Sequence, residues 1–268
     1  MTALPIRLMD KPWGMDVLPA PFAAAPGRRI GEIWFEPPAA LPSLLIKYIF
    51  TSEKLSVQVH PDDAQALAAG ETDSGKDECW LVIHAEPGAA LGVGFDRPID
   101  HGAMRAAALD GSIEHLLTWY PVRPGDFFQI PAGTVHAIGA GVGLIEIQQN
   151  SDITYRLFDY GRPRPLHLEA GIAVANGVPH DPSLRRHIAD AGTIELADGR
   201  YFQAHRIAGR PDPALRAIYA GPVLILPRQG TVRIGDTLVS PGDCAEAAGL
   251  DAVAFDGDGL TIVVRAKA

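Results

Sequence analysis

The chain has 268 residues, of which 47% are hydrophobic and 21% charged, a composition typical of a globular protein and not of a disordered one. Its formal charge of −9 argues against a nucleic-acid backbone as the main partner. The two cysteines have no paired spacing, so no disulfide scaffold is expected. No signal peptide or membrane span is predicted either, and we expect a cytoplasmic protein without membrane partners.

The first part of the chain is predicted to be an all-β sandwich or barrel, because glycine and proline separate short runs rich in Val, Ile, Leu, Phe and Tyr. Strands are expected at residues 31–35, 44–50, 55–60, 78–85, 127–130, 137–140 and 143–149. Helices are expected only at residues 61–70, which have acidic residues in the first turn, and at 100–117, with a break at Gly111 and Ser112.

A change in composition at residues 159–171, "DYGRPRPLHLEAG", predicts the exit from a first domain at 1–165 into a second at 166–268. Short strands resume near Arg200, and "RIGDTL" indicates a hairpin. Residues 123–138 and 240–255 share Pro-Gly-Asp before an apolar stretch, which indicates an internal repeat. Val253 then stands where His136 does, and no histidine follows His205, so the second unit is expected to be structural.

Polar residues with the spacing of metal ligands occur on two of the predicted strands and directly before a third. In "LSVQVHPDD", Ser56, Gln58 and His60 share one strand face, so the side chains of Gln58 and His60 reach a common point. Glu78 shares a face with Trp80, while Cys79 points the other way. A Pro-x-Gly-x-x-His element then places His136 just after a tight turn.

Two imidazoles, one carboxylate and one amide oxygen form a donor set that suits Zn²⁺, or Mn²⁺ or Fe²⁺ in the same geometry. Lys76 precedes Glu78 by two residues, Glu146 lies on the strand at 143–149, and Asp152 and Arg156 follow it. Carboxylate, ammonium and guanidinium groups that are close in sequence to the strands with the candidate metal ligands favour a phosphorylated, polyhydroxylated ligand.

The stretches "KPWG", "LSVQVHPDD", "GKDECWLVI" and "PAGTVHAIGAGVGLIEIQQNSDITYRLFDYGR" resemble the type I phosphomannose isomerases, a metal-dependent branch of the cupin superfamily. The resemblance covers residues 11–162 and is to the short bacterial form. It implies two cupin-type β-barrels (double-stranded β-helices, or jelly rolls), the second degenerate, with short helices inserted in the first. It also implies one zinc per chain and the interconversion of D-mannose 6-phosphate and D-fructose 6-phosphate.

The resemblance assigns roles to individual residues. It implies zinc ligands at Gln58, His60, Glu78 and His136. It implies pocket positions at Trp13, Ser56, Lys76, Glu146 and Asp152, with Arg156 as the active-site arginine. Arg162 is expected to contact substrate, although it stands where relatives commonly carry a lysine.

For an isomerisation through a cis-enediol, we expect Arg156 to stabilise the enediolate and either Lys76 or Glu146 to move the proton. Two alternatives stay open at this point. An Fe²⁺-dependent cupin dioxygenase would usually carry a third histidine where Gln58 stands. A non-catalytic sugar-phosphate-binding cupin would need no proton-transferring group. The sequence leaves both a monomer and a homodimer open.

Overall fold

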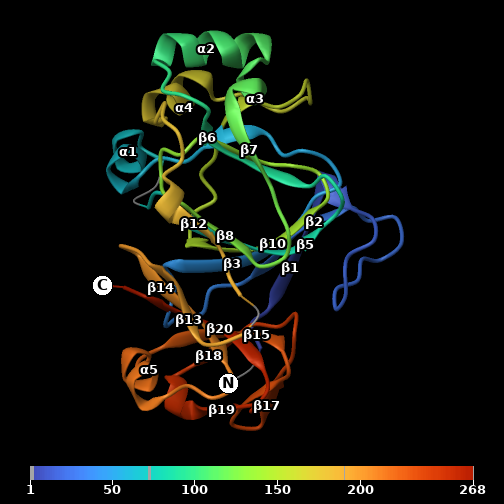
Figure 1. The fold of residues 1–268 in the computed structure, drawn as a ribbon, viewed down its shortest axis with the longest axis vertical. Helices are drawn as coiled ribbons and strands as arrows, with labels where there is room; N and C mark the ends of the chain where they lie inside the picture. Colours follow the sequence, from blue (N-terminus) through green and yellow to red (C-terminus); the bar gives the residue numbers. More distant parts are fainter. Residues whose placement is uncertain (1–2, 72–73, 190, 268) are drawn as a thin grey trace.

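The computed structural model describes residues 3–71, 74–189 and 191–267, and it consists largely of antiparallel β-sheets. Figure 1 shows two β units stacked along the long axis of the molecule. The first barrel, drawn from blue to yellow, is the larger. The second barrel, drawn in orange and red, closes the opposite end. The expected all-β architecture with a second, smaller β unit is confirmed.

The first barrel is made of two sheets whose neighbouring strands all pair antiparallel. The seven-stranded sheet has the order β1 (Ile6–Met15), β2 (Ile30–Phe35), β3 (Leu44–Phe50), β10 (Val142–Gln149), β5 (Glu78–Ala85), β8 (Asp126–Ile130) and β12 (Arg185–His187). The five-stranded sheet has the order β11 (Tyr155–Phe158), β4 (Val57–Val59), β9 (His136–Ile138), β6 (Ala90–Phe95) and β7 (Leu117–Pro121).

The strand that carries the first metal motif is shorter than predicted. β4 covers only Val57–Val59, whereas a strand over residues 55–60 was expected. Val57 and Val59 pack into the cluster beneath the helices, as the alternation predicts. Leu55 precedes the strand and packs instead in the cluster that contains Trp80, so it does not share the face of the two valines.

Four helices pack on the first barrel: α1 (Asp63–Ala68), α2 (His101–Asp110), α3 (Ile113–Leu116) and α4 (Leu168–Val174). In α1 the Asp62 side chain accepts a hydrogen bond from the Gln65 amide, and the Gln65 side chain accepts one from the Asp62 amide. Gly111 ends α2 in the left-handed conformation, with φ 83°, which confirms the predicted break. None of the described helices has the length and hydropathy that a membrane crossing requires.

The second barrel combines a five-stranded and a three-stranded sheet with one helix, α5 (Pro213–Ile218). The larger sheet has the order β13 (Ile194–Asp198), β14 (Phe202–Ala208), β20 (Leu260–Ala266), β15 (Val223–Gln229) and β18 (Ala245–Ala247). The smaller has the order β17 (Thr237–Val239), β16 (Val232–Ile234) and β19 (Val253–Phe255). β16 and β17 form the predicted hairpin, which turns at Gly235 with φ 56°.

The seven-stranded sheet separates two hydrophobic cores. On its outer side, Ile145 belongs to one buried cluster with Ile262 of the second barrel. On its inner side, Trp80 and Val82 belong to the cluster inside the first barrel. Cys79 lies in the outer cluster, so β5 alternates as predicted and its polar end at Glu78 is set toward the barrel interior.

The chain passes residue 165 while it is still in contact with the first barrel. α4 packs on β11, and β12 pairs with β8, with Arg185 opposite Phe128. At the other end of the chain, the Leu4 amide donates to the Cys244 carbonyl at 2.7 Å, so the first described residues pair with the second barrel. A domain division at residue 165 stays a prediction.

Candidate metal centre and ligand pocket

A pocket of about 180 Å³ lies in the first barrel and is lined from both of its sheets. Most of the residues predicted for the site line it: Trp13, Ser56, Gln58, Lys76, Glu146, Asp152 and Arg156. Lys47 and Arg164 line it as well, although no motif predicted them. Arg162 does not.

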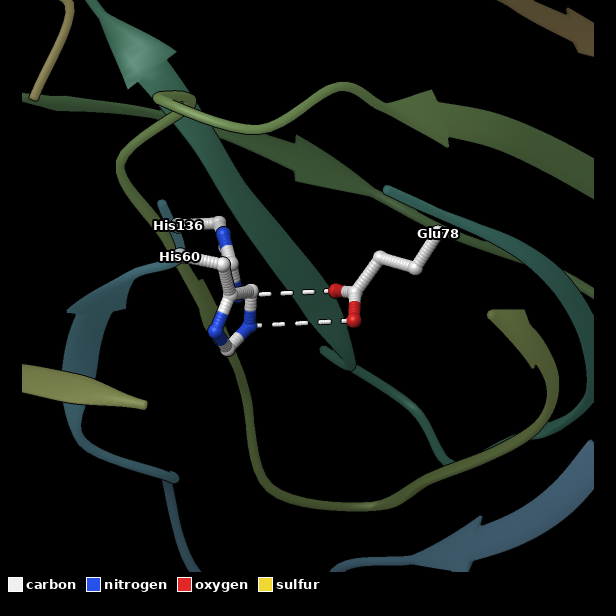
Figure 2. Close-up of side chains that lie close together, drawn as sticks. All are labelled: His60, Glu78 and His136. Carbon is white, nitrogen blue, oxygen red and sulfur yellow. Dashed lines mark ion pairs between the residues drawn. The ribbon is translucent and has the colours of Figure 1, made fainter. Parts of the chain in front are cut away.

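The side chains of His60, Glu78 and His136 converge (Figure 2). Gln58 and Lys76, which line the pocket, lie next to this cluster. The Nε2 atom of His60 lies 3.7 Å from Glu78 Oε2, and Nε2 of His136 lies 3.6 Å from Glu78 Oε1. All three are buried, and their potential ligand atoms lie within 4.8 Å of one another. The structure thus brings together residues that are far apart in the sequence, because β4 pairs Gln58 directly with His136 of β9.

Both histidines are held by backbone carbonyl groups. His60 Nδ1 donates to the Ile153 carbonyl at 2.7 Å, and His136 Nδ1 donates to the Thr134 carbonyl at 2.8 Å. These bonds leave each Nε2 lone pair turned toward Glu78. Burial lowers the pKa of His136 to about 4 and holds that of His60 well below its usual value. Neutral imidazoles are the form that binds a metal.

Glu78 is a buried carboxylate that lacks a full set of partners. Among the described residues none donates a hydrogen bond to its Oε1 atom, and burial raises its pKa. A divalent cation between this carboxylate and the two Nε2 atoms would supply the missing partner. Two imidazole nitrogens and a carboxylate oxygen are donors that Zn²⁺ takes, so the residues fit such an ion.

Gln58 lies beside this cluster. Its Nε2 atom is 3.2 Å from His136 Nε2, and its Oε1 atom accepts a hydrogen bond from Ser56 Oγ at 3.1 Å. Ser56 and Gln58 both line the pocket, so this pair connects the cluster to the space that a ligand would occupy. The role of Gln58 as a fourth ligand stays a prediction.

A row of four inward-facing side chains crosses the sheet beside the cluster. Trp34, Lys47, Glu146 and Trp80 occupy directly opposite positions on β2, β3, β10 and β5. Lys47 Nζ lies 3.1 Å from Glu146 Oε1 and 4.4 Å from the centre of the Trp34 ring. Trp80 Nε1 donates to Glu146 Oε2 at 3.1 Å. Burial opposes ionisation of Glu146, but the lysines outweigh it and the pKa of this carboxyl is lowered.

Lys76 connects the row with the His60–Glu78–His136 cluster. Its Nζ atom is 2.9 Å from Glu78 Oε2, 3.3 Å from His60 Nε2 and 3.9 Å from Glu146 Oε1. Burial would lower the pKa of Lys76, yet the two carboxylates raise it. The pocket floor therefore alternates buried cations and anions.

Two arginines line the same pocket. Within the described ranges, no hydrogen bond or ion pair involves the guanidinium of Arg156, whose backbone pairs with Gln58. Burial and the nearby charge of Arg164 lower the pKa of Arg156. A guanidinium without an anionic partner, beside a second guanidinium, can bind an anionic ligand group.

Known proteins that are similar to this chain in sequence and fold are named mannose-6-phosphate isomerases. The mannose-6-phosphate isomerase of Streptococcus mutans is 39% identical over 206 residues, which cover 72% of this chain and 63% of that protein. The probable mannose-6-phosphate isomerase GmuF of Bacillus subtilis is 33% identical over 218 residues, 74% of this chain and 69% of that protein. This chain belongs to the mannose-6-phosphate isomerase family. The chain thus spans less than two thirds of the Streptococcus relative. A search with models of protein families found no match.

Solved structures of the mannose-6-phosphate isomerase family share the fold over the whole chain. The Bacillus subtilis enzyme superposes with a TM-score of 0.81 at 24% identity and covers 98% of each chain. A variant of phosphomannose isomerase from Salmonella typhimurium superposes with a TM-score of 0.74 at 15% identity and covers 99% of each chain. At these identities the likeness shows the fold, including both β units.

Lys47 and Arg164 are two of the pocket residues that sequence reasoning missed in this family member, and the polar or aromatic residues Lys11, Glu32, Trp34 and Thr154 are others. Lys47 stands inside the apolar run "LLIKYIF", which was interpreted only as a strand. Burying an unpaired ammonium group is energetically costly, so a lysine in a fully buried strand needs a buried anionic partner. A lysine inside an apolar run is therefore the sequence signal that could have identified Lys47. For Arg164, "GRPRP" contains two arginines separated by a proline, and nothing in the pattern tells which one faces the pocket.

Proposed function

We propose that this protein is a zinc-dependent aldose–ketose isomerase that interconverts D-mannose 6-phosphate and D-fructose 6-phosphate through a cis-enediol. The observation that carries the proposal is that one pocket adjoins a buried His-Glu-His cluster, a buried lysine–glutamate network and Arg156, which has no anionic partner in the part of the chain that the structure describes. Membership of the mannose-6-phosphate isomerase family supports it. A cytoplasmic location and a phosphorylated hexose as ligand belong to the same proposal.

His60, Glu78 and His136 would hold the zinc ion, with Gln58 beside them. A bound divalent metal at this place supplies a Lewis acid for a carbonyl or hydroxyl oxygen of the sugar. The carbonyls of Ile153 and Thr134 keep both imidazoles in the tautomer that presents Nε2. Because Gln58 and Lys76 line the pocket and lie next to the cluster, the substrate would approach it from the pocket side.

Arg156 and Arg164 would bind the anionic parts of the substrate. Among the described residues, no side chain or carbonyl holds the Arg156 guanidinium, while Arg164 is held by Asp159 and still lines the pocket. A guanidinium offers parallel N–H donors that fit phosphate oxygens, or an oxygen on which negative charge develops. Asp152 and Ser56 line the same space and provide acceptor and donor groups for sugar hydroxyls.

Isomerisation moves one proton between C1 and C2, and we assign this transfer to either Lys76 or Glu146. Both line the pocket and both are buried. The Glu146 carboxylate is held from two sides by Lys47 and Trp80, which fixes its position toward the pocket. Lys76 lies between Glu146 and Glu78, where an ammonium group can stabilise negative charge on a substrate oxygen.

The test is a coupled assay for fructose 6-phosphate formed from mannose 6-phosphate, using purified protein whose metal content has been measured. Zinc-loaded protein is expected to turn over, and chelated protein is expected to lose activity that zinc restores. Binding of mannose 6-phosphate without turnover, in fully loaded protein, would contradict catalysis and favour a sugar-phosphate-binding role. Full activity after complete metal removal would contradict metal dependence.

A further inference from the structure

Arg162 lies two residues before Arg164, which lines the pocket, but its own guanidinium is bound by other protein groups. Its Nη1 atom donates to Asp159 Oδ1 at 3.0 Å. Its Nη2 atom donates to the Lys54 carbonyl at 2.7 Å and to Glu53 Oε2 at 3.2 Å. Its side chain is 15% exposed, and it is absent from the pocket lining. These contacts leave little of the guanidinium for a ligand.

Asp159 is shared between this arginine and the one that does line the pocket. Arg164 donates from Nε to Asp159 Oδ2 at 2.7 Å and from Nη2 to Oδ1 at 2.6 Å. The Asp159 side chain is only 2% exposed, so its position is set by these two arginines and not by solvent. Arg162, Asp159 and Arg164 therefore form a chain of charge-assisted hydrogen bonds that ends at the pocket.

We propose that Arg162 is a positioning residue that acts through Asp159 to hold the Arg164 guanidinium at the pocket beside Arg156, and that it does not itself contact substrate. The inference rests on the proposed function in that the anion bound there is a sugar phosphate. Two guanidiniums held close together repel each other, and a fixed aspartate offsets this repulsion before the ligand arrives. Burial and the charge of Arg164 lower the pKa of Arg156, in agreement with such closeness.

The far side of Arg162 is anchored as well. Glu53 also accepts a hydrogen bond from Arg29 Nη1 at 3.2 Å, and the same nitrogen donates to the Pro12 carbonyl at 2.6 Å. Pro12 precedes Trp13, a residue of the pocket wall. The chain of contacts thus joins the loop that carries Arg164 to the segment that carries Trp13, and Arg162 stands at its centre.

The experiment uses the full-length, metal-loaded protein and compares Arg162→Met, Arg164→Met and the double variant. The readouts are kcat and KM for mannose 6-phosphate, and the dissociation constant of inorganic phosphate by calorimetry. Each single variant is expected to raise KM and the phosphate dissociation constant about tenfold, with kcat within about twofold of wild type. The double variant is expected to match Arg164→Met alone, because Arg162 acts through Arg164.

Arg162→Lys separates positioning from direct contact. A lysine keeps the charge and would retain a direct phosphate contact, but one ammonium cannot reproduce the planar fork that spans Asp159 and Glu53. We therefore expect Arg162→Lys to resemble Arg162→Met. Arg105→Met is the matched control, because Arg105 donates twice to Glu169 at 2.9 and 2.6 Å on the helices and does not line the pocket. It is expected to leave all readouts unchanged.

Additive effects of the two single variants, full rescue by Arg162→Lys, or wild-type values for Arg162→Met would each overturn the inference. Its failure is distinguishable from failure of the proposed function. If the variants bind phosphate with the expected pattern but the protein does not convert mannose 6-phosphate, the positioning role of Arg162 is supported and the isomerase function is rejected. If the wild-type protein isomerises mannose 6-phosphate but shows no measurable phosphate binding, only the positioning role of Arg162 is rejected.

Discussion

Lys47 and Glu146 form an ion pair with side chains only 5% and 4% exposed, and Lys47 also lies over the Trp34 ring. Lys47→Met would leave Glu146 buried with one cation fewer, and removing one partner of a buried pair costs about 3–5 kcal/mol. We expect the free energy of unfolding to fall by roughly 3 kcal/mol. Isomerase activity should fall too, because Glu146 loses one of the groups that hold it. Urea unfolding and the coupled assay measure the two effects.

Lys54→Met is the matched control for this variant. Lys54 pairs with Glu114, but its side chain is 46% exposed, and exposed pairs contribute below about 1 kcal/mol. The Lys54 carbonyl that binds Arg162 is unaffected by the change. Equal losses of unfolding free energy in the two variants would show that the buried Lys47–Glu146 pair contributes no more to stability than an exposed pair.

The metal cluster gives a second prediction for single residues. His136→Ala removes one of two imidazoles, and we expect the purified protein to lose both the zinc binding and the isomerase activity that we propose for it. Elemental analysis by mass spectrometry measures the first and the coupled assay the second. His187→Ala is the control, because His187 is 38% exposed and pairs with Asp126 outside the pocket. Retention of stoichiometric zinc in His136→Ala would contradict the assignment of the cluster.

The sequence predicts the metal cluster better than the anion-binding part of the pocket. His60, Glu78 and His136 follow from strand alternation and a turn motif, which are local rules. The orientations of Arg162 and Arg164 depend on Asp159, which both of them contact within one irregular loop. Such contacts depend on tertiary packing, and no periodicity in the sequence records them.

At the scale of elements, the turn between β8 and β9 sets the position of His136. Gly133 has φ +84°, and its amide donates to the His60 carbonyl at 2.8 Å. An added Cβ would displace the Asn176 amide, whose Nδ2 lies at 2.4 Å, and would crowd the Val174 carbonyl oxygen at 3.1 Å. Gly133→Ala therefore combines backbone strain with a collision. We expect a loss of about 2–3 kcal/mol in unfolding free energy and weaker zinc binding, measured by urea unfolding and competition with a chelator.

Gly88→Ala isolates the contribution of the backbone. Gly88 has φ +87°, and nothing lies within 4 Å of an added Cβ. We expect this variant to lose only about 1 kcal/mol and to bind zinc as wild type does. If Gly133→Ala behaves in the same way as Gly88→Ala, the crowding around the turn has no effect on the metal centre.

Elements were predictable where burial alone dictates them. β3 and β5 have the predicted bounds, because continuous apolar and alternating patterns are strong signals. β1 was missed, because its edge position tolerates charged residues and Pro12. The predicted helix at 100–117 ends before Leu117, which begins β7, because aromatic residues follow it and pair with β6.

At the scale of the whole molecule, the two barrels share one hydrophobic cluster, which holds Ile145 of the first barrel and Ile262 of the second. We expect a single cooperative unfolding transition. Ile145→Ala and Ile262→Ala are each expected to lower the free energy of unfolding by about 2–4 kcal/mol. Scanning calorimetry measures the unfolding transition, and the release of zinc to a chelator during heating reports whether the first barrel unfolds in the same transition. Two separate transitions, with only one of them shifted by each variant, would contradict a shared core.

The pairing of the Leu4 amide with the Cys244 carbonyl has a consequence for synthesis on the ribosome. The segment around Leu4 is synthesised before the strand of the second barrel with which it pairs, and the outer face of the seven-stranded sheet is likewise synthesised before the strands that cover it. At about 5–20 residues per second, the interval between the completion of β12 and the appearance of β18 lasts on the order of 3–12 s. During that time the nascent first barrel carries an uncovered apolar surface, so the nascent chain is expected to need shielding by a chaperone until the strands of the second barrel emerge.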